Sequence, residues 1–395
     1  MRVAFLTAGG LAPCLSASIA YLIKEYAKLN DSIEFFGYKN GYKGLLLGQK
    51  ISIPNIVEQV DILASYGGSP IGNSRVKLTN VDDCIKNGYI NKGQTPLSVA
   101  SEQLKKDKID VLHTIGGDDT NTAAGDLVDY LNQNNYSLTV VGLPKTVDND
   151  VYPIQQTLGA STAASQGALF FNNIVNENTT SSRQLIIHEV MGRNCGWLTA
   201  ATAYEYRKML DQKKFIPEIL INKKRWDVHA IYLPEKEINF EAECVRLNQV
   251  MDLHDCVNVF LSEGAGLNAI INEMESNNEE IKYDAFGHVR LDEINPGNWF
   301  AKNFKSKLNA DKVLVQKSGY FSRSSAPNLY DISLIQETTK IAVESALKNE
   351  SGVIGLDEDD NNQMKCIKFD RIKGGKPFDI STDWFVKLLK DIEQE

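Results

Sequence analysis

The chain has 395 residues, of which 43% are hydrophobic and 24% charged, and its formal net charge is −9 at pH 7. This length suits two or three domains rather than one core, and the composition is that of a globular protein. The acidic balance argues against nonspecific nucleic-acid binding, which requires a basic surface. No run approaches the roughly 18 apolar residues of a membrane-spanning helix.

Targeting and cysteine patterns point to one compartment. Residues 1–7 (MRVAFLT) run directly into glycines, so we expect no signal peptide. The six cysteines and five histidines are scattered, without CxxC or HExxH spacing. We therefore expect neither a disulfide framework nor a structural zinc site, and we predict a cytoplasmic protein.

Short apolar runs alternate with helix-like stretches along the chain. The expected strands are residues 2–6, 110–115, 138–143, 185–190, 257–261 and 353–356, and the clearest expected helices are 123–131, 160–175 and 331–348. This alternation predicts parallel sheets covered by helices on both faces, arranged as two α/β lobes. Three polar stretches, 211–226, 275–282 and 357–362, are expected to be surface excursions or solvated loops.

The first two candidate loops combine glycine with chemistry at a strand end, where open α/β sheets bind ligands. TAGGLAPC (7–14) can bring backbone N–H groups to an anion, or can be simply a tight turn. In IGGDDT (115–120), Asp118 suits Mg²⁺, a hard cation that prefers carboxylates and phosphate oxygens. Helix capping by Asp119 or Thr120 is the alternative.

Two further loops carry basic residues. PKTVDND (144–150) offers a lysine to neutralise phosphate and an aspartate to accept the proton of an attacking hydroxyl. An ordinary polar turn after a strand is the alternative interpretation. In EVMGRNCGW (189–197), Arg193 could close on a phosphate or be a structural arginine.

A competing fingerprint lies in residues 257–269. Gly264, Gly266 and Ala269 match GxGxxA between an expected strand and an expected helix, and Asp284 follows at the spacing of a ribose-binding acid. A dinucleotide-dependent dehydrogenase would, however, give no role to the acid-rich loops. No GxxxxGK[ST] motif occurs, which argues against a P-loop nucleotidase.

Taken together, the four loops resemble the phosphofructokinase family, specifically its pyrophosphate-dependent members. The match runs from TAGGLAPC to GYFSR (319–323) and the following helix, and the order of GGDDT, PKTVDND, MGR and SEGAG carries it. A GGD-T turn alone is shared with NAD kinases and lipid kinases of a related fold, which are not expected to carry PKTVDND followed by MGR.

The resemblance implies an α/β phosphofructokinase fold with two Rossmann-like lobes and mainly parallel sheets flanked by helices. Residues 1–158 plus about 322–372 would form the pyrophosphate and Mg²⁺ lobe, and 159–321 plus about 373–395 the fructose 6-phosphate lobe. The implied reaction is reversible, Mg²⁺-dependent transfer of a phosphoryl group from pyrophosphate to the 1-hydroxyl of fructose 6-phosphate, in an active site between the lobes.

The resemblance also implies roles for particular residues. Asp148 would be the base, Asp118 the Mg²⁺ ligand, and Asp119 and Lys145 further catalytic residues. The implied substrate-binding residues are Gly10, Arg75, Thr146, Val147, Asp148, Met191, Gly192, Arg193, Glu263, Tyr320 and Arg323. Gly10 and Arg75 would face the donor, Glu263 the sugar hydroxyls, and Tyr320 and Arg323 the 6-phosphate.

Asp119 and Lys145 carry the choice of donor. ATP-using relatives have glycine at both positions, which leaves room for the rest of the nucleotide. A carboxylate at 119 would fill that space and repel an α-phosphate, while the ammonium of Lys145 would neutralise the departing phosphate. We therefore expect pyrophosphate as the donor, with an ATP-dependent 6-phosphofructokinase as the leading alternative.

Some positions depart from the family's pattern. Leu11 stands where nucleotide-using relatives have aspartate. Arg183 is the candidate arginine for reaching a neighbouring subunit's sugar phosphate, but one extra residue separates it from Glu189, and Lys317 is the nearest basic match for a second arginine. The resemblance implies a homodimer. A non-catalytic regulatory subunit is a further alternative that Asp118 and Asp148 argue against, and sedoheptulose 7-phosphate stays open as a second acceptor.

Overall fold

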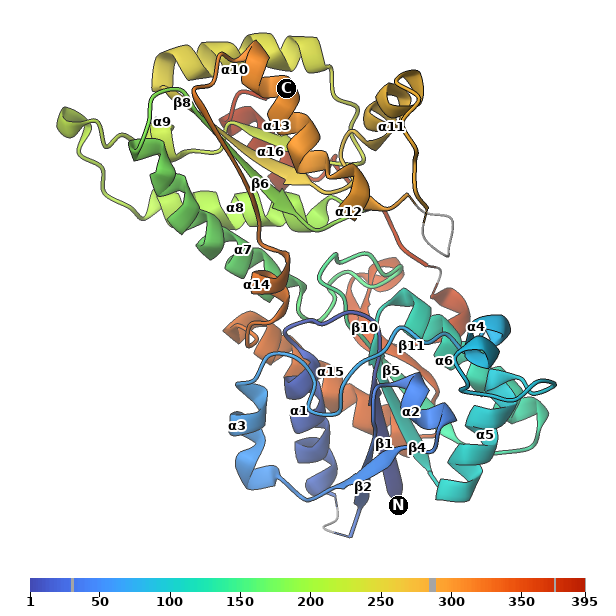
Figure 1. The fold of residues 1–395 in the computed structure, drawn as a ribbon. Coiled ribbons are helices and arrows are strands. Elements are labelled where there is room, and N and C mark those ends of the chain that lie inside the picture. Colours follow the sequence, from blue (N-terminus) through green and yellow to red (C-terminus); the bar gives the residue numbers. More distant parts are fainter. Residues whose placement is uncertain (30–31, 284–288, 373, 395) are drawn as a thin grey trace. The chain divides into compact units, whose positions relative to one another are not determined.

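A computed structural model describes residues 1–29, 32–283, 289–372 and 374–394 (Figure 1). The chain divides into two compact units. Unit 1 comprises Met1–Ala163 and Arg323–Lys376, and unit 2 comprises Ala164–Ser322 and Pro377–Glu395. The chain therefore crosses between units after residues 163, 322 and 376, whereas the lobe boundaries expected from the sequence stood at 158, 321 and about 372.

Unit 1 is built on a seven-stranded sheet in the order β11-β10-β5-β4-β1-β2-β3. Its strands are β1 (Arg2–Thr7), β2 (Glu34–Tyr38), β3 (Lys50–Ile53), β4 (Val111–Gly116), β5 (Thr139–Pro144), β10 (Gly352–Asp357) and β11 (Gln363–Ile367). The five inner strands are parallel, and only the edge strands β3 and β11 pair antiparallel. The prediction of a mainly parallel sheet is thus confirmed.

Helices cover both faces of this sheet (Figure 1). They are α1 (Leu15–Ala27), α2 (Tyr42–Leu46), α3 (Val60–Ala64), α4 (Val81–Lys86), α5 (Pro96–Asp107), α6 (Asp118–Gln133) and α15 (Leu329–Leu347). Side chains alternate along β1: Leu6 packs in the core shared with α5 and α6, whereas Phe5 stacks on His113. His113 accepts or donates a 2.7 Å hydrogen bond with Tyr26 of α1 on that second face.

Unit 2 contains a four-stranded, all-parallel sheet in the order β7-β8-β6-β9. Its strands are β6 (Gln184–Val190), β7 (Ala230–Tyr232), β8 (Cys256–Ser262) and β9 (Lys312–Lys317), and its helices are α7 (Ala160–Ile174), α8 (Trp197–Asp211), α9 (Lys223–Trp226), α10 (Phe240–His254), α11 (Leu267–Ser276), α12 (Leu291–Ile294), α13 (Pro296–Lys307), α14 (Gly319–Arg323) and α16 (Asp383–Asp391). Helices α7 and α14 each run across a unit boundary.

Alternation along β6 again assigns helices to two faces. Ile187 belongs to the core formed with α10 and α13, where Phe300 and Phe304 are fully buried. The next residue, His188, faces the other way and stacks on Phe171 of α7. The strands that the sequence predicted at residues 185–190 and 257–261 are therefore central strands of this sheet.

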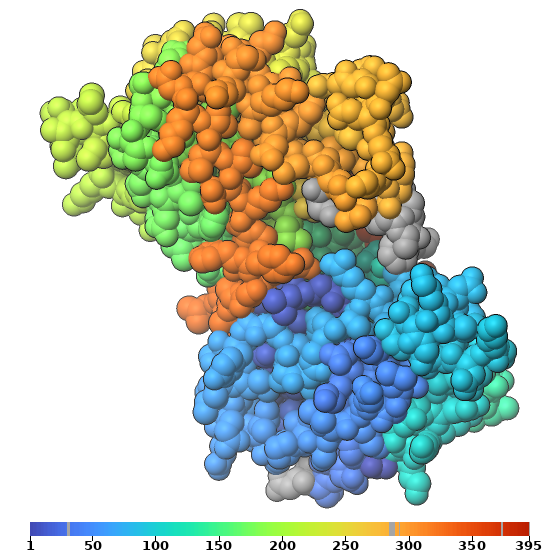
Figure 2. Space-filling model, in the orientation of Figure 1, coloured from blue at the N-terminus to red at the C-terminus, as the bar shows by residue number. Residues whose placement is uncertain are grey.

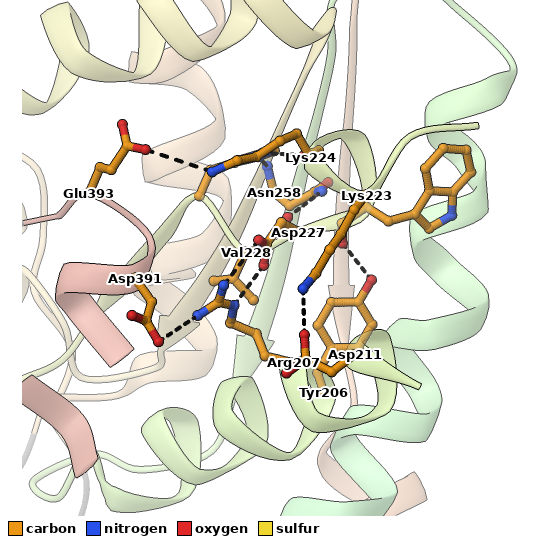
Figure 3. Close-up of polar contacts among 12 residues, drawn as sticks. Tyr206, Arg207, Asp211, Lys223, Lys224, Asp227, Val228, Asn258, Asp391 and Glu393 are labelled. Carbon is orange, nitrogen blue, oxygen red and sulfur yellow. Dashed lines mark hydrogen bonds and ion pairs between the residues drawn. The ribbon is translucent and has the colours of Figure 1, made fainter. Parts of the chain in front are cut away.

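The lysine-rich stretch expected to be a surface excursion projects from the body of unit 2 (Figure 2). Its tip is closed by an antiparallel bridge between Ile216 and Ile221, and Leu220 is 71% exposed. Below the tip, Arg207 forms a pair of hydrogen bonds with the buried carboxylate of Asp227 at 2.8 and 3.2 Å (Figure 3). The excursion is thus joined to the rest of unit 2 beside a buried, hydrogen-bonded ion pair.

The acidic stretch 357–362 differs in part from the expected solvated loop. Asp357 is fully buried, and Arg371 and Lys365 pair with its carboxylate at 2.6 and 2.9 Å. The hydrogen bonds from Arg371 lower the pKa of Asp357 to about 2. Charge within this loop is therefore neutralised by bases that lie 8 and 14 residues further along the chain.

The expectations on membrane spans, cysteines and the competing fingerprint can be compared with the structure. None of the helices in the described part of the chain is long and apolar enough to cross a membrane. All six cysteines are free thiols, and five of them are buried. Asp284, the acid of the competing dinucleotide fingerprint, lies outside the described residues.

Candidate functional site

The loops of interest in unit 1 meet at a switch in strand order. Strand β1 pairs with β2 on one side and with β4 on the other, so the crossovers leave β1 in opposite directions. Such a switch point opens a crevice at the carboxyl ends of the strands, where ligands bind in this type of fold. The loops that follow β1, β4 and β5 are TAGGLAPC, GDDT and KTVDND, and they lie side by side at this edge.

The turn after β1 needs both of its glycines. Gly9 has a φ of +81°, and its N–H donates a 2.9 Å hydrogen bond to the carbonyl oxygen of Ser74. A Cβ on Gly10 would lie 1.8 Å from the guanidinium of Arg323. The Nε of Arg323 donates to the carbonyl oxygen of Leu11 at 2.8 Å, which positions the guanidinium beside Gly10. Glycine at position 10 therefore lets a cation approach the backbone of the turn.

Lys145 lies against the same turn. Its ammonium donates a 2.7 Å hydrogen bond to the carbonyl oxygen of Gly10, and the residue is only 4% exposed. Burial, helped by the charges of Arg323 and Arg75, lowers the pKa of Lys145 to about 8, and Cys14 and Asp148 oppose this shift. Three cations thus gather around one glycine turn, a concentration of positive charge suited to a phosphate.

The loop after β5 is held in place by its own hydrogen bonds. The N–H of Asp148 donates to the Thr146 hydroxyl at 3.1 Å, and the hydroxyl of Thr157 donates to the Thr146 carbonyl at 2.9 Å. Asn149 adopts a φ of +54° and accepts a 2.7 Å hydrogen bond from the N–H of Thr157. Val147 between them is buried. The backbone that carries Asp148 is therefore fixed by local contacts.

Two carboxylates begin α6 directly after Gly116 and Gly117. Asp119 forms a 2.8 Å ion pair with Lys77. Burial raises the pKa of Asp150, and the neighbouring charge of Asp118 raises it further. Asp118 and Asp150 therefore interact unfavourably as they stand, and a divalent cation between them would relieve that repulsion.

Asp150 was not among the site residues predicted from the sequence. Its signal was present as the second acid of PKTVDND, but only the tertiary structure brings it near Asp118. No group of three or more His, Cys, Asp or Glu side chains that could hold a metal exists within the described residues. One or two carboxylates together with phosphate oxygens are the usual Mg²⁺ environment, so this donor set fits that ion.

Unit 2 brings a second set of loops together at the carboxyl ends of β6 and β8. Val190 pairs with Ser262, so Met191–Arg193 and Glu263–Gly264 emerge next to each other. The N–H of Gly192 lies 3.4 Å from the carboxylate of Glu263. A Cβ on Gly264 would lie 1.8 Å from the carbonyl oxygen of Arg193. Gly264 thus permits close packing of two backbone segments, which accounts for one glycine of the GxGxxA match.

Tyr320 follows the adjacent strand β9 and is 82% exposed. A Cβ on its neighbour Gly319 would contact the sulfur of Met191 at 3.4 Å, which places this turn beside the MGR loop. Arg323, only three residues later, instead contacts the glycine turn of unit 1. Its assignment to the sugar-phosphate pocket therefore stays a prediction.

The two basic candidates for a neighbouring subunit's site are engaged within unit 2. Arg183 pairs with Asp252 at 2.7 Å and donates to the carbonyl oxygens of Leu308 and Asn309. Lys317 pairs with the buried carboxylate of Glu189 at 2.8 Å. That Arg183 or Lys317 serves a neighbouring subunit stays a prediction.

The predicted residues thus divide between the units. Unit 1 holds Gly10, Arg75, Asp118, Asp119, Lys145, Thr146, Val147, Asp148 and Arg323, and unit 2 holds Met191, Gly192, Arg193, Glu263 and Tyr320. All of them except Arg75 follow the carboxyl ends of parallel strands, and Arg75 lies on the segment between α3 and α4. Glycine turns, clustered cations and paired acids at a strand switch define the class as an α/β phosphotransferase.

Comparison with known proteins gives the family. A sequence model described as "Phosphofructokinase" matches residues 2–346, and the chain belongs to the phosphofructokinase family. A pyrophosphate--fructose 6-phosphate 1-phosphotransferase of Methylotuvimicrobium alcaliphilum is 58% identical over 394 residues, covering 100% of this chain and 96% of that protein. One of Mastigamoeba balamuthi is 53% identical over 393 residues, covering 99% and 96%. An ATP-dependent 6-phosphofructokinase 2 of Streptomyces coelicolor is 26% identical, covering 89% of both chains.

Solved structures support the fold. A pyrophosphate-dependent phosphofructokinase from Nitrosospira multiformis superposes with a TM-score of 0.72 at 18% identity, covering 99% of this chain and 90% of that one. One from Marinobacter aquaeolei gives 0.70 at 22% identity, covering 98% and 88%. The predicted phosphofructokinase fold is confirmed.

Proposed function

We propose that this protein catalyses reversible phosphoryl transfer from pyrophosphate to the 1-hydroxyl of fructose 6-phosphate, giving fructose 1,6-bisphosphate and phosphate. The single observation that carries the proposal is the buried ammonium of Lys145 on the carbonyl oxygen of Gly10, with Asp119 at the start of α6. Relatives more than half identical over their full length bear the name of this activity, which supports the same reaction for this chain.

Unit 1 is proposed to bind the donor. Lys145, Arg75 and Arg323 would neutralise a diphosphate at the Gly9–Gly10 turn, since both arginines lie within electrostatic reach of Lys145. Asp118 and Asp150 would hold Mg²⁺. When bound, Mg²⁺ would neutralise phosphate oxygens and so lower the cost of the charge that develops during transfer. Asp119 and Lys145 would occupy the space that two glycines leave open for the nucleotide in ATP-using relatives.

Asp148 is proposed as the base. The Thr146 hydroxyl and the Asn149 turn fix its backbone, so its carboxylate is presented without a search through loop conformations. As the bond from the C1 oxygen to phosphorus forms, Asp148 would take the hydroxyl proton, and Lys145 would stabilise the phosphate that leaves. The reverse reaction uses the same groups, with protonated Asp148 as the acid.

Unit 2 is proposed to bind the sugar phosphate. Glu263 directly follows β8, and one of its carboxylate oxygens lies 3.4 Å from the N–H of Gly192. The same carboxylate would accept hydrogen bonds from sugar hydroxyls. Arg193 and Tyr320 follow β6 and β9 and would contact the sugar and its 6-phosphate. A cytoplasmic homodimer, in which Arg183 or Lys317 would serve a neighbouring subunit, belongs to the same proposal.

The direct test mixes purified protein, Mg²⁺ and fructose 6-phosphate with either pyrophosphate or ATP and measures fructose 1,6-bisphosphate. We expect turnover with pyrophosphate only. Omitting Mg²⁺ with a chelator should abolish it, and readdition should restore it. Faster turnover on ATP than on pyrophosphate would reject the donor assignment while leaving the reaction class intact.

A further inference from the structure

An acid next to an anion-binding turn poses an electrostatic problem. Asp118 and Asp119 occupy the first turn of α6, directly after two glycines. Asp118 interacts with Asp150 and has a proposed metal to neutralise it. Asp119 lies one residue further on, and an uncompensated carboxylate there would repel a diphosphate across a short distance.

Lys77 supplies the compensation. Its ammonium lies 2.8 Å from the carboxylate of Asp119. Both groups are partly solvated, with side-chain exposures of 31% for Lys77 and 61% for Asp119. Solvated ion pairs contribute little to folding stability, so the main consequence of this pair is where it places and neutralises the carboxylate.

The chain segment that carries Lys77 is fastened to the donor turn. The carbonyl oxygen of Ser74 accepts a hydrogen bond from the N–H of Gly9 at 2.9 Å, and the side-chain amide of Asn73 lies 3.4 Å from the carbonyl oxygen of Gly10. The Lys77–Asp119 pair therefore links this segment to the start of α6, alongside the glycine turn. Residues 73–76 also line an open cavity of about 420 Å³.

We propose that Lys77 is a specificity-determining residue that neutralises Asp119 and holds its carboxylate to one side of the donor turn. The acid can then occupy the space a nucleotide needs without repelling the smaller diphosphate. This inference rests on the proposed function. It assigns a part in donor choice to Lys77, a residue outside the four loops that suggested the reaction.

The test is a pairwise set of variants with two readouts, calorimetric binding of pyrophosphate with Mg²⁺ and steady-state kinetics. Lys77→Met should weaken pyrophosphate binding and raise its KM about fivefold, with kcat changed less than about twofold. Lys77→Arg should keep the parent affinity. Lys77→Met combined with Asp119→Asn should recover most of the lost affinity, since a neutral amide needs no cation.

A control removes another surface ion pair of unit 1, at the opposite end of α1 from the donor turn. Lys28 pairs with Glu25 at 2.5 Å on α1, and Lys28→Met should leave pyrophosphate affinity and KM unchanged. Equal affinities for the parent and Lys77→Met, or a double variant as weak as Lys77→Met, would overturn the inference alone. No pyrophosphate binding by the unaltered chain would overturn the proposed function, and the inference with it.

Discussion

The ammonium of Lys145 donates a 2.7 Å hydrogen bond to the carbonyl oxygen of Gly10, although the two residues are separated by 135 positions in the chain. Strands β1, β4 and β5 are neighbours in the sheet, so the loops that follow them share one edge. Burial at this edge lowers the pKa of Lys145, so the charge on its ammonium depends on pH.

Catalysis should weaken as Lys145 loses its proton. Burial lowers the pKa of Lys145 to about 8, so the group is charged below that pH and neutral above it. Since the charge attracts diphosphate, kcat/KM for pyrophosphate should fall as pH rises through about 8. Lys145→Arg keeps its charge and should move the fall to higher pH. A parent profile flat to pH 10 would contradict the role of this charge.

Gly10→Ala should impair catalysis more than folding. The added Cβ would lie 1.8 Å from the guanidinium of Arg323, which is the flexible end of a side chain and can move aside. Displacing a positioned cation by about 1 Å commonly costs about 10²-fold in rate. We expect a loss of that order in kcat/KM with an unfolding midpoint near that of the parent. Unchanged kinetics would show that the position of Arg323 does not matter.

The donor should be exchangeable at two positions. Asp119→Gly combined with Lys145→Gly should gain ATP-dependent turnover and lose pyrophosphate-dependent turnover, because it opens space and removes the cation on the leaving phosphate. The measurement is fructose 1,6-bisphosphate formed with each donor. A double variant that loses pyrophosphate use without gaining any ATP use would count against the steric account.

The base of the unit 2 excursion offers a stability test. Asp227 has 5% side-chain exposure and pairs with Arg207 at 2.8 Å (Figure 3). Arg207→Met would leave that carboxylate buried without its cation, at a cost of about 3 kcal/mol. All four tryptophans (Trp197, Trp226, Trp299 and Trp384) belong to unit 2, so their fluorescence follows its unfolding.

The neighbouring residue provides the control for that measurement. Lys208 forms an exposed pair with Glu205, and Lys208→Met should change the free energy of unfolding by less than about 1 kcal/mol. If both variants unfold at the same denaturant concentration as the parent, the Arg207–Asp227 pair does not stabilise unit 2.

His188 should make unit 2 acid-sensitive. It is fully buried among aromatic rings, neither ring nitrogen has a hydrogen-bond partner within the described residues, and burial lowers its pKa to about 3. An unfolded chain takes up that proton below a pKa of about 6.5, so stability is present above that pH and falls below it by up to about 1.4 kcal/mol per unit.

His188→Phe removes this titration and should flatten the loss of stability between about pH 6 and pH 4, measured by tryptophan fluorescence in denaturant. His254→Gln is the control, because His254 is only partly buried and should change the slope less. An identical pH slope in the parent and His188→Phe would exclude His188 as the source.

Much of this protein could be predicted from local patterns. Short apolar runs followed by turn residues located β1, β4, β5, β6 and β8, because a buried parallel strand needs a short apolar segment and a turn. The ordered set of GGDDT, PKTVDND, MGR and SEGAG identified the phosphofructokinase family, which the full-length comparisons confirm.

Contacts between distant segments could not be predicted in this way. The sequence by itself determined which residue types stand at each strand end, since strand periodicity and turn chemistry act over a few residues. Only the tertiary structure decided that Lys77 pairs with Asp119, that Arg323 lies on the Gly10 turn and that Asp150 meets Asp118. Strand order in the sheet sets these encounters, and no local pattern encodes which loops will become neighbours.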